Sequence, residues 1–442
     1  MYSRVMITLP EMITWLSEAV ATFPDKRTGK NTHYTLEDAA LGAFSVFFTQ
    51  SPSFLAHQRE MQKTLGLNNA SSLFGLIDIP TDNHIRDLLD EVPPERVFKV
   101  FDNIFNKLRD EGFIEQFRGG REDLLIALDG TEYFTSESIN CDKCSEREYI
   151  SGKITYSHSM ITPAIVAPDS PLVIPLTPEY ITPQDGDSKQ DWEVKAAKRW
   201  IRRYGSKLSP LQVTILGDDL YAHQPICMEL LSAGFNFILV CKEDSHKTLY
   251  EWINGITQEI RTERVTGVRK IKKETWIYRF VNNVPLRDQK GKNDKVLSVN
   301  FAEITIIDEE DKIKYHNAFI TNHQITGENV EEIVGYGRGR WKIENENINT
   351  LKTKGYHLEH NFGHGKRYLS QLLAAFTLIA FLMHTVMDLT DLLYRTLRLR
   401  LGSRESFFNA IKQLTTFMYF RDWIHLFTFM IEGLKRRHLA PG

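Results

Sequence analysis

Residues 124–130, LLIALDG, and residues 213–219, VTILGDD, decide the fold class. Each is a short aliphatic run that ends in an aspartate, Asp129 or Asp218, which is typical of a buried strand running into a turn. The segments around them alternate between strand-like and helix-like periodicity, in the order LLIALDG, KITYSHSMITPAIVA, PLVIPLTPEYI, WEVKAAKRWIRRYGSKL, QVTILGDD, HQPICMELLSAGF and NFILVCK. Three strands, a helix, a strand, a helix and a strand predict an α/β fold with a mixed sheet flanked by helices.

The periodicity of apolar residues also divides the rest of the chain into regions. Apolar residues three and four positions apart predict helices in the first part of the chain, and short strand-like runs joined by Gly, Asn and Lys predict a β-rich insertion in the core. The expected regions are a helical N-terminal domain (1–120), the core's first part (121–245), a β-rich insertion (246–332), the core's second part (333–394) and a basic helical C-terminal region (395–442).

Composition excludes several classes of protein. With 442 residues, 42% of them hydrophobic, the chain is too apolar for general disorder and lacks the bias of collagen or a coiled coil. The net charge of −3 weighs against a nucleic-acid partner at first sight. Positive charge is nevertheless concentrated in 195–207, in 261–292 and after residue 395. Because exposed charges are screened beyond about 8 to 10 Å, such basic faces can still bind phosphate.

The cellular compartment is expected to be the cytoplasm, with the protein associated with the nucleoid. Four cysteines are too few for a disulfide scaffold of this size and indicate reducing surroundings. The N-terminal residues show no signal-peptide pattern. The most apolar stretch, residues 372–387, is short for a membrane span and contains His384, so we expect a buried helix there.

Two aspartates at strand ends suggest a metal site. If the strands that precede Asp129 and Asp218 are parallel neighbours, both carboxylates emerge at the same end of the sheet and can share a divalent cation. Oxygen ligands on rigid strand ends suit Mg²⁺. At the second position Asp218 is preferred because it directly follows the strand, and Asp219 is expected to cap the next helix. The alternative interpretation is that each aspartate is only a turn residue.

A third carboxylate is expected from the helix after the insertion. Trp341, Ile348 and Leu351 share a helical face with Glu344, whereas Glu346 lies about 200° away at 100° per residue. We expect that face to pack on the sheet, so that Glu344 is carried to the strand ends while Glu346 faces solvent.

Two basic residues accompany Glu344 on this helix. Arg340 and Lys352 lie close to the same face and could hold DNA phosphates or orient the carboxylate. The alternative is that they form ordinary ion pairs on the helix surface.

At this point the sequence resembles a known family. The element order with Asp, Asp and Glu at these stations is similar to that of RNase H-like DDE transposases of bacterial and archaeal insertion sequences with a β-rich insertion. The matching stretches are LIALDGTEYF, VTILGDDLYA, RWKIENENINTLK, GYHLEHNFGHGK and SLFGLIDIPTDNHIRDLLD. The family's Tyr, Arg, Glu and Lys signature is matched by Arg340 and Glu344. Tyr336 and Lys352 each stand one residue out of register, so their equivalence is weaker.

The resemblance implies a function. Asp129, Asp218 and Glu344 would be catalytic and would bind two Mg²⁺ ions, with Mn²⁺ able to substitute, for phosphodiester hydrolysis and strand transfer in cut-and-paste DNA transposition. The partners would be double-stranded DNA, namely the terminal inverted repeats of the element and target DNA, bound by a homodimer and in part by the helical N-terminal domain. The alternatives are a DDE-type nuclease without strand transfer and a transposase-derived DNA-binding regulator.

The insertion carries a further candidate DNA contact. Trp276 lies among basic residues, including Lys272 and Lys273, and could stack on an unpaired base. Insertions in related transposases place a Trp in this way. The alternative, which we favour for the Trp on general grounds, is a cross-strand core aromatic.

Cysteine and histidine residues leave one further question open. Cys141 and Cys144 have half the spacing of a zinc site, and His158 could add a ligand, but there is no second close pair of cysteines. An ordinary reduced hairpin is the favoured interpretation.

Two further segments, one rich in histidine and one basic, give a less specific indication of function. His357, His360 and His364 are expected to contact phosphate or to belong to a structured loop rather than to bind metal. Residues 435–438, KRRH, are either a DNA-contacting tail or a solvated helix end.

Overall fold

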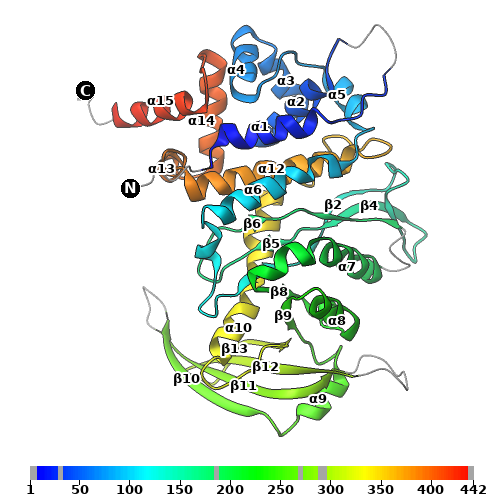
Figure 1. Ribbon diagram of the computed structural model, residues 1–442, viewed down its shortest axis with the longest axis vertical. Helices are drawn as coiled ribbons and strands as arrows, with labels where there is room; N and C mark the ends of the chain where they lie inside the picture. Colours follow the sequence, from blue (N-terminus) through cyan, green and yellow to red (C-terminus); the bar gives the residue numbers. More distant parts are fainter. Residues whose placement is uncertain (1–6, 28–32, 184–188, 267–271, 287–295, 437–442) are drawn as a thin grey trace.

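The structure, a computed structural model, describes residues 7–27, 33–183, 189–266, 272–286 and 296–436. The molecule is elongated and has three parts along its long axis (Figure 1). Helices from both ends of the chain lie at one end, an α/β core lies in the middle, and a long antiparallel sheet lies at the other end.

The core is a mixed sheet centred on β1 (Leu124–Ala127). This strand pairs in parallel with β8 (Val213–Gly217), which pairs in parallel with β9 (Asn236–Val240). On its other side β1 pairs antiparallel with β5 (Ala164–Ile165), which continues to β6 (Ile174–Pro175). Every residue of β1 and β8 is buried, as expected for strands covered on both faces. The predicted α/β class with a mixed sheet flanked by helices is confirmed.

Helices cover both faces of this sheet. In Figure 1, β8 and β9 lie between α7 (Lys189–Leu208) and α8 (Gln224–Ser232) on one side and α10 (Val330–Gly339) on the other. Gly337 allows α10 to approach closely, because a Cβ atom there would lie 2.7 Å from the Phe319 ring. The short helices of this part are η4 (Ser209–Leu211), η5 (Asp219–Tyr221), a π-helical turn η6 (Ile343–Ile348) and α11 (Asn349–Thr353).

The β-rich insertion continues the core sheet. Its strands are β10 (Gln258–Thr266), β11 (Lys272–Leu286), β12 (Leu297–Asp308) and β13 (Ile313–Thr321), and α9 (Lys247–Ile253) precedes them. All four strands are antiparallel neighbours, and β13 pairs with β9 of the core. The result is one sheet of nine strands, in the order β10-β11-β12-β13-β9-β8-β1-β5-β6.

A second, smaller sheet adjoins the core. It contains β2 (Gly130–Ser136), β3 (Ser145–Glu148), β4 (Ile154–Ile161) and β7 (Glu179–Ile181). The sequence predicts one strand over 153–167, but the structure divides it into β4 and β5, which belong to different sheets. Pro163 lies between the two and lacks the N–H that a continuous ladder needs.

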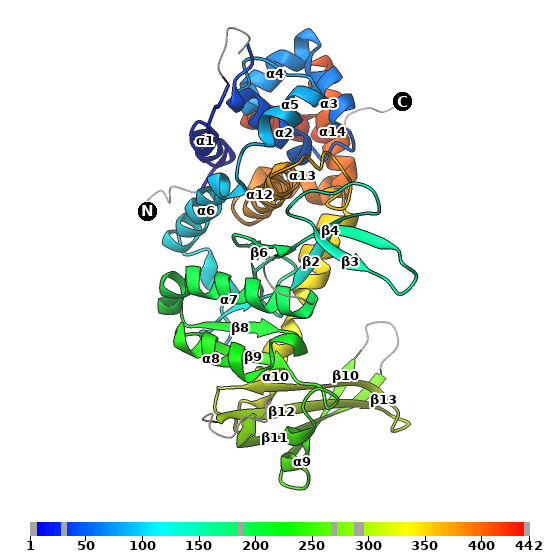
Figure 2. The ribbon, with the colours of Figure 1, turned by 90° about the vertical axis from the view of Figure 1, so that its right-hand side faces the viewer.

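The helices from the two ends of the chain form one packed unit (Figure 2). Its helices are α1 (Leu9–Val20), α2 (Leu36–Phe48), α3 (Phe54–Met61), α4 (Thr64–Phe74), α5 (Asp82–Leu89), η1 (Pro94–Val97), α6 (Phe98–Asp110), η2 (Ile114–Phe117), α12 (Leu369–Thr390), α13 (Leu392–Leu401), α14 (Arg404–Phe417) and α15 (Trp423–Arg436). The Asn69 side chain donates to the carbonyls of Thr415 and Met418, both at 2.8 Å, and Trp423 Nε1 donates to Leu73 O at 2.8 Å. Residues some 350 positions apart therefore share one core.

The most apolar helix, α12, runs through this unit and packs against α2. It is long and apolar enough to cross a membrane, but 89% of its most apolar window is buried inside the protein. The expected buried helix at 372–387 is confirmed. Its one polar ring, His384, is hydrogen-bonded through Nδ1 to the Tyr356 hydroxyl at 2.6 Å.

Candidate active site at the strand ends

Asp129 and Asp218 follow the carboxyl ends of two neighbouring parallel strands. In the β1–β8 ladder Ala127 stands opposite Leu216, and the Leu128 N–H still donates to Leu216 O at 2.9 Å. Two residues further along each strand, the same register brings Asp129 level with Asp218, across a spacing of about 4.8 Å between strands. The expected parallel pairing, and with it the emergence of both aspartates at one end of the sheet, is present.

The electrostatics of Asp129 define the site. Burial, the largest cause, raises the pKa of Asp129 to about 7, while the Arg340 guanidinium opposes the rise. The carboxylates of Glu193, Asp218 and Glu344 raise the pKa further. Because such interactions weaken with distance, Glu193, Asp218, Glu344 and Arg340 lie near enough to Asp129 for their charges to act on its carboxyl group. Burial also raises the pKa of Asp218, against the Leu220 N–H and Arg340.

Glu344 reaches this region from η6, the π-helical turn that follows α10. Its Oε1 accepts a hydrogen bond from Arg340 at 2.8 Å. The Arg340 side chain is 19% exposed, whereas that of Glu344 is 51% exposed. Arg340 therefore forms the ion pair that the sequence allowed, and its positive charge also opposes the rise in the pKa of both aspartates.

The predicted orientation of this helix is wrong in part. Ile348 and Leu351 are buried as expected, but Trp341 is 44% exposed. The π-turn has more residues per turn than an α-helix, so a projection at 100° per residue fails across it. Glu346 was expected to face solvent, but it is half-buried and lines a cavity of about 790 Å³ beside the helical unit, whereas the Glu344 side chain is exposed.

A fourth carboxylate, Glu193 on α7, was not anticipated from the sequence. It contributes to the raised pKa of Asp129, and its Oε1 accepts a hydrogen bond from the Tyr221 hydroxyl at 2.9 Å. A Cβ atom on Gly130 would lie 2.5 Å from Glu193 Oε2, so the glycine after Asp129 leaves room for this carboxylate. Helical periodicity does not reveal such a contact, because it depends on how α7 crosses the sheet.

The doublet Asp218–Asp219 differs from the prediction. Asp218, not Asp219, is the cap, since its Oδ1 accepts from the Leu220 N–H at 3.0 Å. Asp219 turns away and accepts hydrogen bonds from the Lys242 N–H and the Ser245 hydroxyl. Asp219 thereby fastens the turn after β9, which leaves Asp218 as the carboxylate of the pair that shares a region with Asp129.

Two of the residues expected to contact DNA, Tyr336 and Lys352, form hydrogen bonds or ion pairs with other residues of the protein. Tyr336 is 4% exposed; its hydroxyl donates to Glu332 at 2.7 Å and accepts from the Arg121 N–H at 3.2 Å. The structure thus gives Tyr336 a structural role in place of the predicted DNA contact, because the phenol has almost no accessible surface. Lys352 forms an ion pair with Glu359 at 2.7 Å.

Trp276 lies on β11 of the insertion and is only partly buried. The guanidinium groups of Arg264 and Arg338 lie 4.0 and 4.8 Å from its ring centroid. The ring therefore packs against two arginines, one of them from α10. Of the neighbouring lysines, Lys273 is exposed, while the side chain of Lys272 lies outside the described residues. In the 435–438 segment Lys435 is exposed, and the side chains of the other three residues lie outside the described residues.

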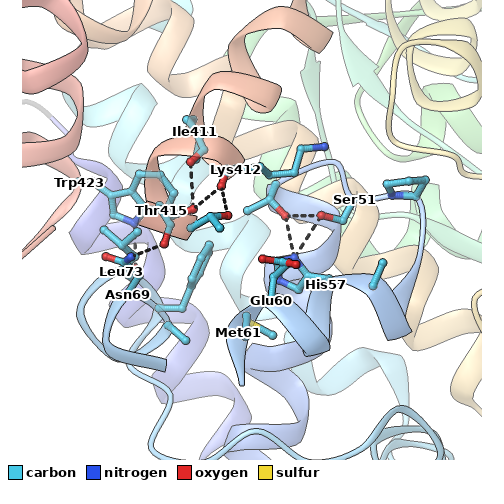
Figure 3. Close-up of a pocket in the computed structure, with 16 residues that line it drawn as sticks. Ser51, His57, Glu60, Met61, Asn69, Leu73, Ile411, Lys412, Thr415 and Trp423 are labelled. Carbon is cyan, nitrogen blue, oxygen red and sulfur yellow. Dashed lines mark hydrogen bonds between the residues drawn. The ribbon is translucent and has the colours of Figure 1, made fainter. Parts of the chain in front are cut away.

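A cavity of about 180 Å³ lies elsewhere, in the helical unit (Figure 3). Its lining comes mainly from α3, α4 and α14 and is largely apolar. Burial lowers the pKa of His57 in its wall to about 4, so this histidine is neutral near pH 7. The ring is fixed by hydrogen bonds to Ser45 at 2.9 Å and Ser51 at 3.1 Å. This cavity lacks the grouped carboxylates of the strand ends, and we regard it as a packing feature.

The donor chemistry at the strand ends fits a hard divalent cation. Carboxylate oxygens on two strand ends and one helix are the ligands that Mg²⁺ prefers. Among the described residues, however, the acids do not form a group whose oxygen atoms all lie within 4.8 Å of one another. The ion pair with Arg340 engages Glu344 in this arrangement.

Comparison with known proteins adds no further constraint. No family model matches the chain, and no curated protein shows a significant match to it.

Proposed function

We propose that the protein is a metal-dependent phosphoryl-transfer enzyme of the DDE class, with an RNase H-like core. The observation that supports this most directly is the position of Asp129 and Asp218 at adjacent ends of parallel strands, with Glu344 and Arg340 beside them. The order of the core elements, including an insertion before the Glu344 helix, is the order that the motif resemblance implies.

Within this class, we assign the chain to DNA transposases of insertion sequences. Asp129, Asp218 and Glu344 would hold Mg²⁺, or Mn²⁺ in its place. When bound, the metal would activate a water, and later a DNA 3′-hydroxyl, for in-line attack on a phosphodiester. The partners would be element-end and target DNA, and the DNA complex would contain a homodimer.

The residues of the chain have separate roles in this proposal. The rigid strand ends would fix two carboxylates, while the more exposed Glu344 would complete the set. Arg340 neutralises part of the acidic charge and, once Glu344 binds metal, could contact a phosphate oxygen. Glu193 would increase the negative electrostatic potential at the strand ends, and the hydrogen bond from the Tyr221 hydroxyl would orient its carboxylate.

Cleavage of DNA carrying the ends of the element tests the proposal. Inverted repeats flanking the gene would supply the substrate. Asp129→Asn, Asp218→Asn and Glu344→Gln should each abolish Mg²⁺-dependent strand cleavage while leaving DNA binding within about twofold. Glu346→Gln is the matched control, because it changes a carboxylate two residues from Glu344 that faces another cavity; it should cleave normally.

The outcomes separate the competing functions. Normal cleavage by any of the three site variants would refute the assignment. Cleavage without joining of the 3′ end to target DNA would indicate a nuclease. Sequence-specific binding without cleavage by the unmodified protein would indicate a regulator.

A further inference from the structure

A second set of converging ligands lies away from the strand-end acids. Cys141, Cys144, His158 and His364 each direct one ligand atom to a common point, and these atoms all lie within 4.8 Å of one another. Both cysteines are free thiols. Among the described residues this is the group of His, Cys, Asp or Glu side chains whose spacing could hold a metal ion.

The distances are those of the corners of a tetrahedron. The two Sγ atoms are 3.8 Å apart, and His158 Nε2 lies 3.5 Å from each. His364 Nε2 lies 3.3 Å from Cys144 Sγ and 3.1 Å from His158 Nε2. With Zn–S of ~2.3 Å and Zn–N of ~2.0 to 2.1 Å, tetrahedral zinc requires S–S of ~3.8 Å, S–N of ~3.6 Å and N–N of ~3.3 Å.

Local structure presents the ligands to this point. A tight turn, closed by the Cys144 N–H donating to Cys141 O at 3.0 Å, brings both thiols to the same side. His158 comes from the adjacent strand β4, and His364 from the loop after α11. Cys144, His158 and His364 are 7%, 2% and 7% exposed, so water reaches the centre poorly.

The histidine hydrogen bonding also favours a cation. His364 Nδ1 lies 2.8 Å from Gly365 O, and since a carbonyl only accepts, Nδ1 carries the hydrogen. His364 Nε2 therefore presents a lone pair toward His158 and Cys144. A backbone carbonyl behind the ligating ring is the usual outer partner of a metal-bound histidine. A single proton could form a hydrogen bond between only two of the four ligand atoms, whereas one metal ion could bind all four.

We propose that these four residues form a structural zinc site of the Cys₂His₂ type. Four protein ligands leave no open position for substrate, so the site would be structural rather than catalytic. It would tie β3 and β4 to the loop that leads from the Glu344 helix into α12. Cys144 and His364 are 220 residues apart, and closing so long a loop constrains the unfolded chain strongly.

The same loop is anchored to the helical unit. Asp90 accepts hydrogen bonds from the N–H groups of Lys366 at 2.8 Å and Arg367 at 3.0 Å, directly after the ligating histidine. Arg86 donates to Phe362 O at 2.8 Å just before it. The zinc would therefore join the small sheet to the loop that carries His364, which hydrogen bonds already hold to the helical unit.

The metal content of the full-length protein tests this proposal without any DNA substrate. Protein purified without chelator should contain about one zinc per chain by plasma mass spectrometry. Cys144→Ser and His364→Ala should each lose most of it. Cys241→Ser and His360→Ala, a buried cysteine and a loop histidine outside the cluster, should retain it.

Two further measurements cover variants that fail to fold. His364→Cys offers a thiolate in place of the imidazole and should retain one metal. The Co²⁺ form of the unmodified protein should show the visible bands of tetrahedral cobalt with thiolate ligands, and those bands should change in His364→Cys. Chelation should lower the melting temperature by several degrees.

Several results would overturn the proposal. These are unmodified protein that takes up neither zinc nor cobalt, a Cys141–Cys144 disulfide in the native protein, or equal metal loss in the control variants. Because none of these measurements involves DNA cleavage, the zinc site and the proposed phosphoryl-transfer function stand or fall separately.

Discussion

Replacing Asp129 by Asn should stabilise the protein at alkaline pH and leave it unchanged in acid. The folded state raises the pKa of this carboxyl from 3.8 to about 7, mainly by burial. A group whose pKa is raised on folding holds its proton more tightly in the folded state. Its stabilising contribution is complete below pH 3.8 and is lost as the pH rises through 7. The unmodified protein at pH 8 therefore carries an ionised, partly buried carboxylate that the Asn variant lacks.

The magnitude follows from the size of the shift. A rise of about 3 pKa units corresponds to about 4 kcal/mol at 1.36 kcal/mol per unit. Side-chain relaxation and water entry reduce this value, so we expect the Asn variant to gain about 1 to 3 kcal/mol at pH 8 and close to zero at pH 4.

Urea denaturation at the two pH values measures the effect. Asp169→Asn, which removes an exposed carboxylate, is the control and should show no difference between them. Mg²⁺ at pH 8 should stabilise the unmodified protein and have little effect on the Asp129 variant. The reasoning is refuted if Asp129→Asn is no more stable than the unmodified protein at pH 8, or if its gain is equal at both pH values.

Three other predictions concern packing and the insertion. Asn69→Ala removes three hydrogen bonds that join the two ends of the chain and should cost about 3 kcal/mol in urea denaturation, while exposed Asn68→Ala should cost almost nothing. Tyr336→Phe should cost about 1 kcal/mol with no change in DNA affinity; a fall in affinity without loss of stability would restore its predicted DNA contact. If Trp276 stacks on an unpaired base, Trp276→Ala should weaken binding to DNA with an unpaired base by about tenfold and leave binding to intact duplex unaffected in a fluorescence assay. Equal effects on both DNAs would exclude base stacking and leave the packing role against Arg264 and Arg338.

The sequence predicted those strands of the core whose residues carry a clear local pattern of hydrophobicity. Short aliphatic runs ending in Asp129 and Asp218 predicted two buried strands. Their parallel pairing was only a condition of the predicted metal site, because six strands and a helix lie between them in the chain, and the structure meets that condition. The insertion was also predicted as β-rich. Its pairing with β9 was not, because edge-to-edge contact between strands leaves no local signal.

Other features depended on tertiary structure or on irregular backbone. The π-turn at Ile343–Ile348 invalidated a projection that assumed 3.6 residues per turn, so the exposure of Trp341 and of the Glu344 side chain was missed. Glu193 could not be linked to Asp129 from sequence spacing. Sequence spacing likewise gave no indication that His364 lies beside Cys144. Pro163, by contrast, was visible in the sequence and should have divided the strand predicted over 153–167 into two.

The continuity of the nine-stranded sheet has a mechanical consequence. The insertion is not tethered by a flexible linker; it shares one hydrogen-bonded ladder with the strand beside β8. A force applied to β11, for example by bent DNA resting on it, would be transmitted across β12, β13 and β9 to the strand that ends at Asp218. If the proposed DNA substrate contacts the insertion, a displacement of β11 would reach the acidic end of the core through hydrogen-bonded strands and not through a flexible linker.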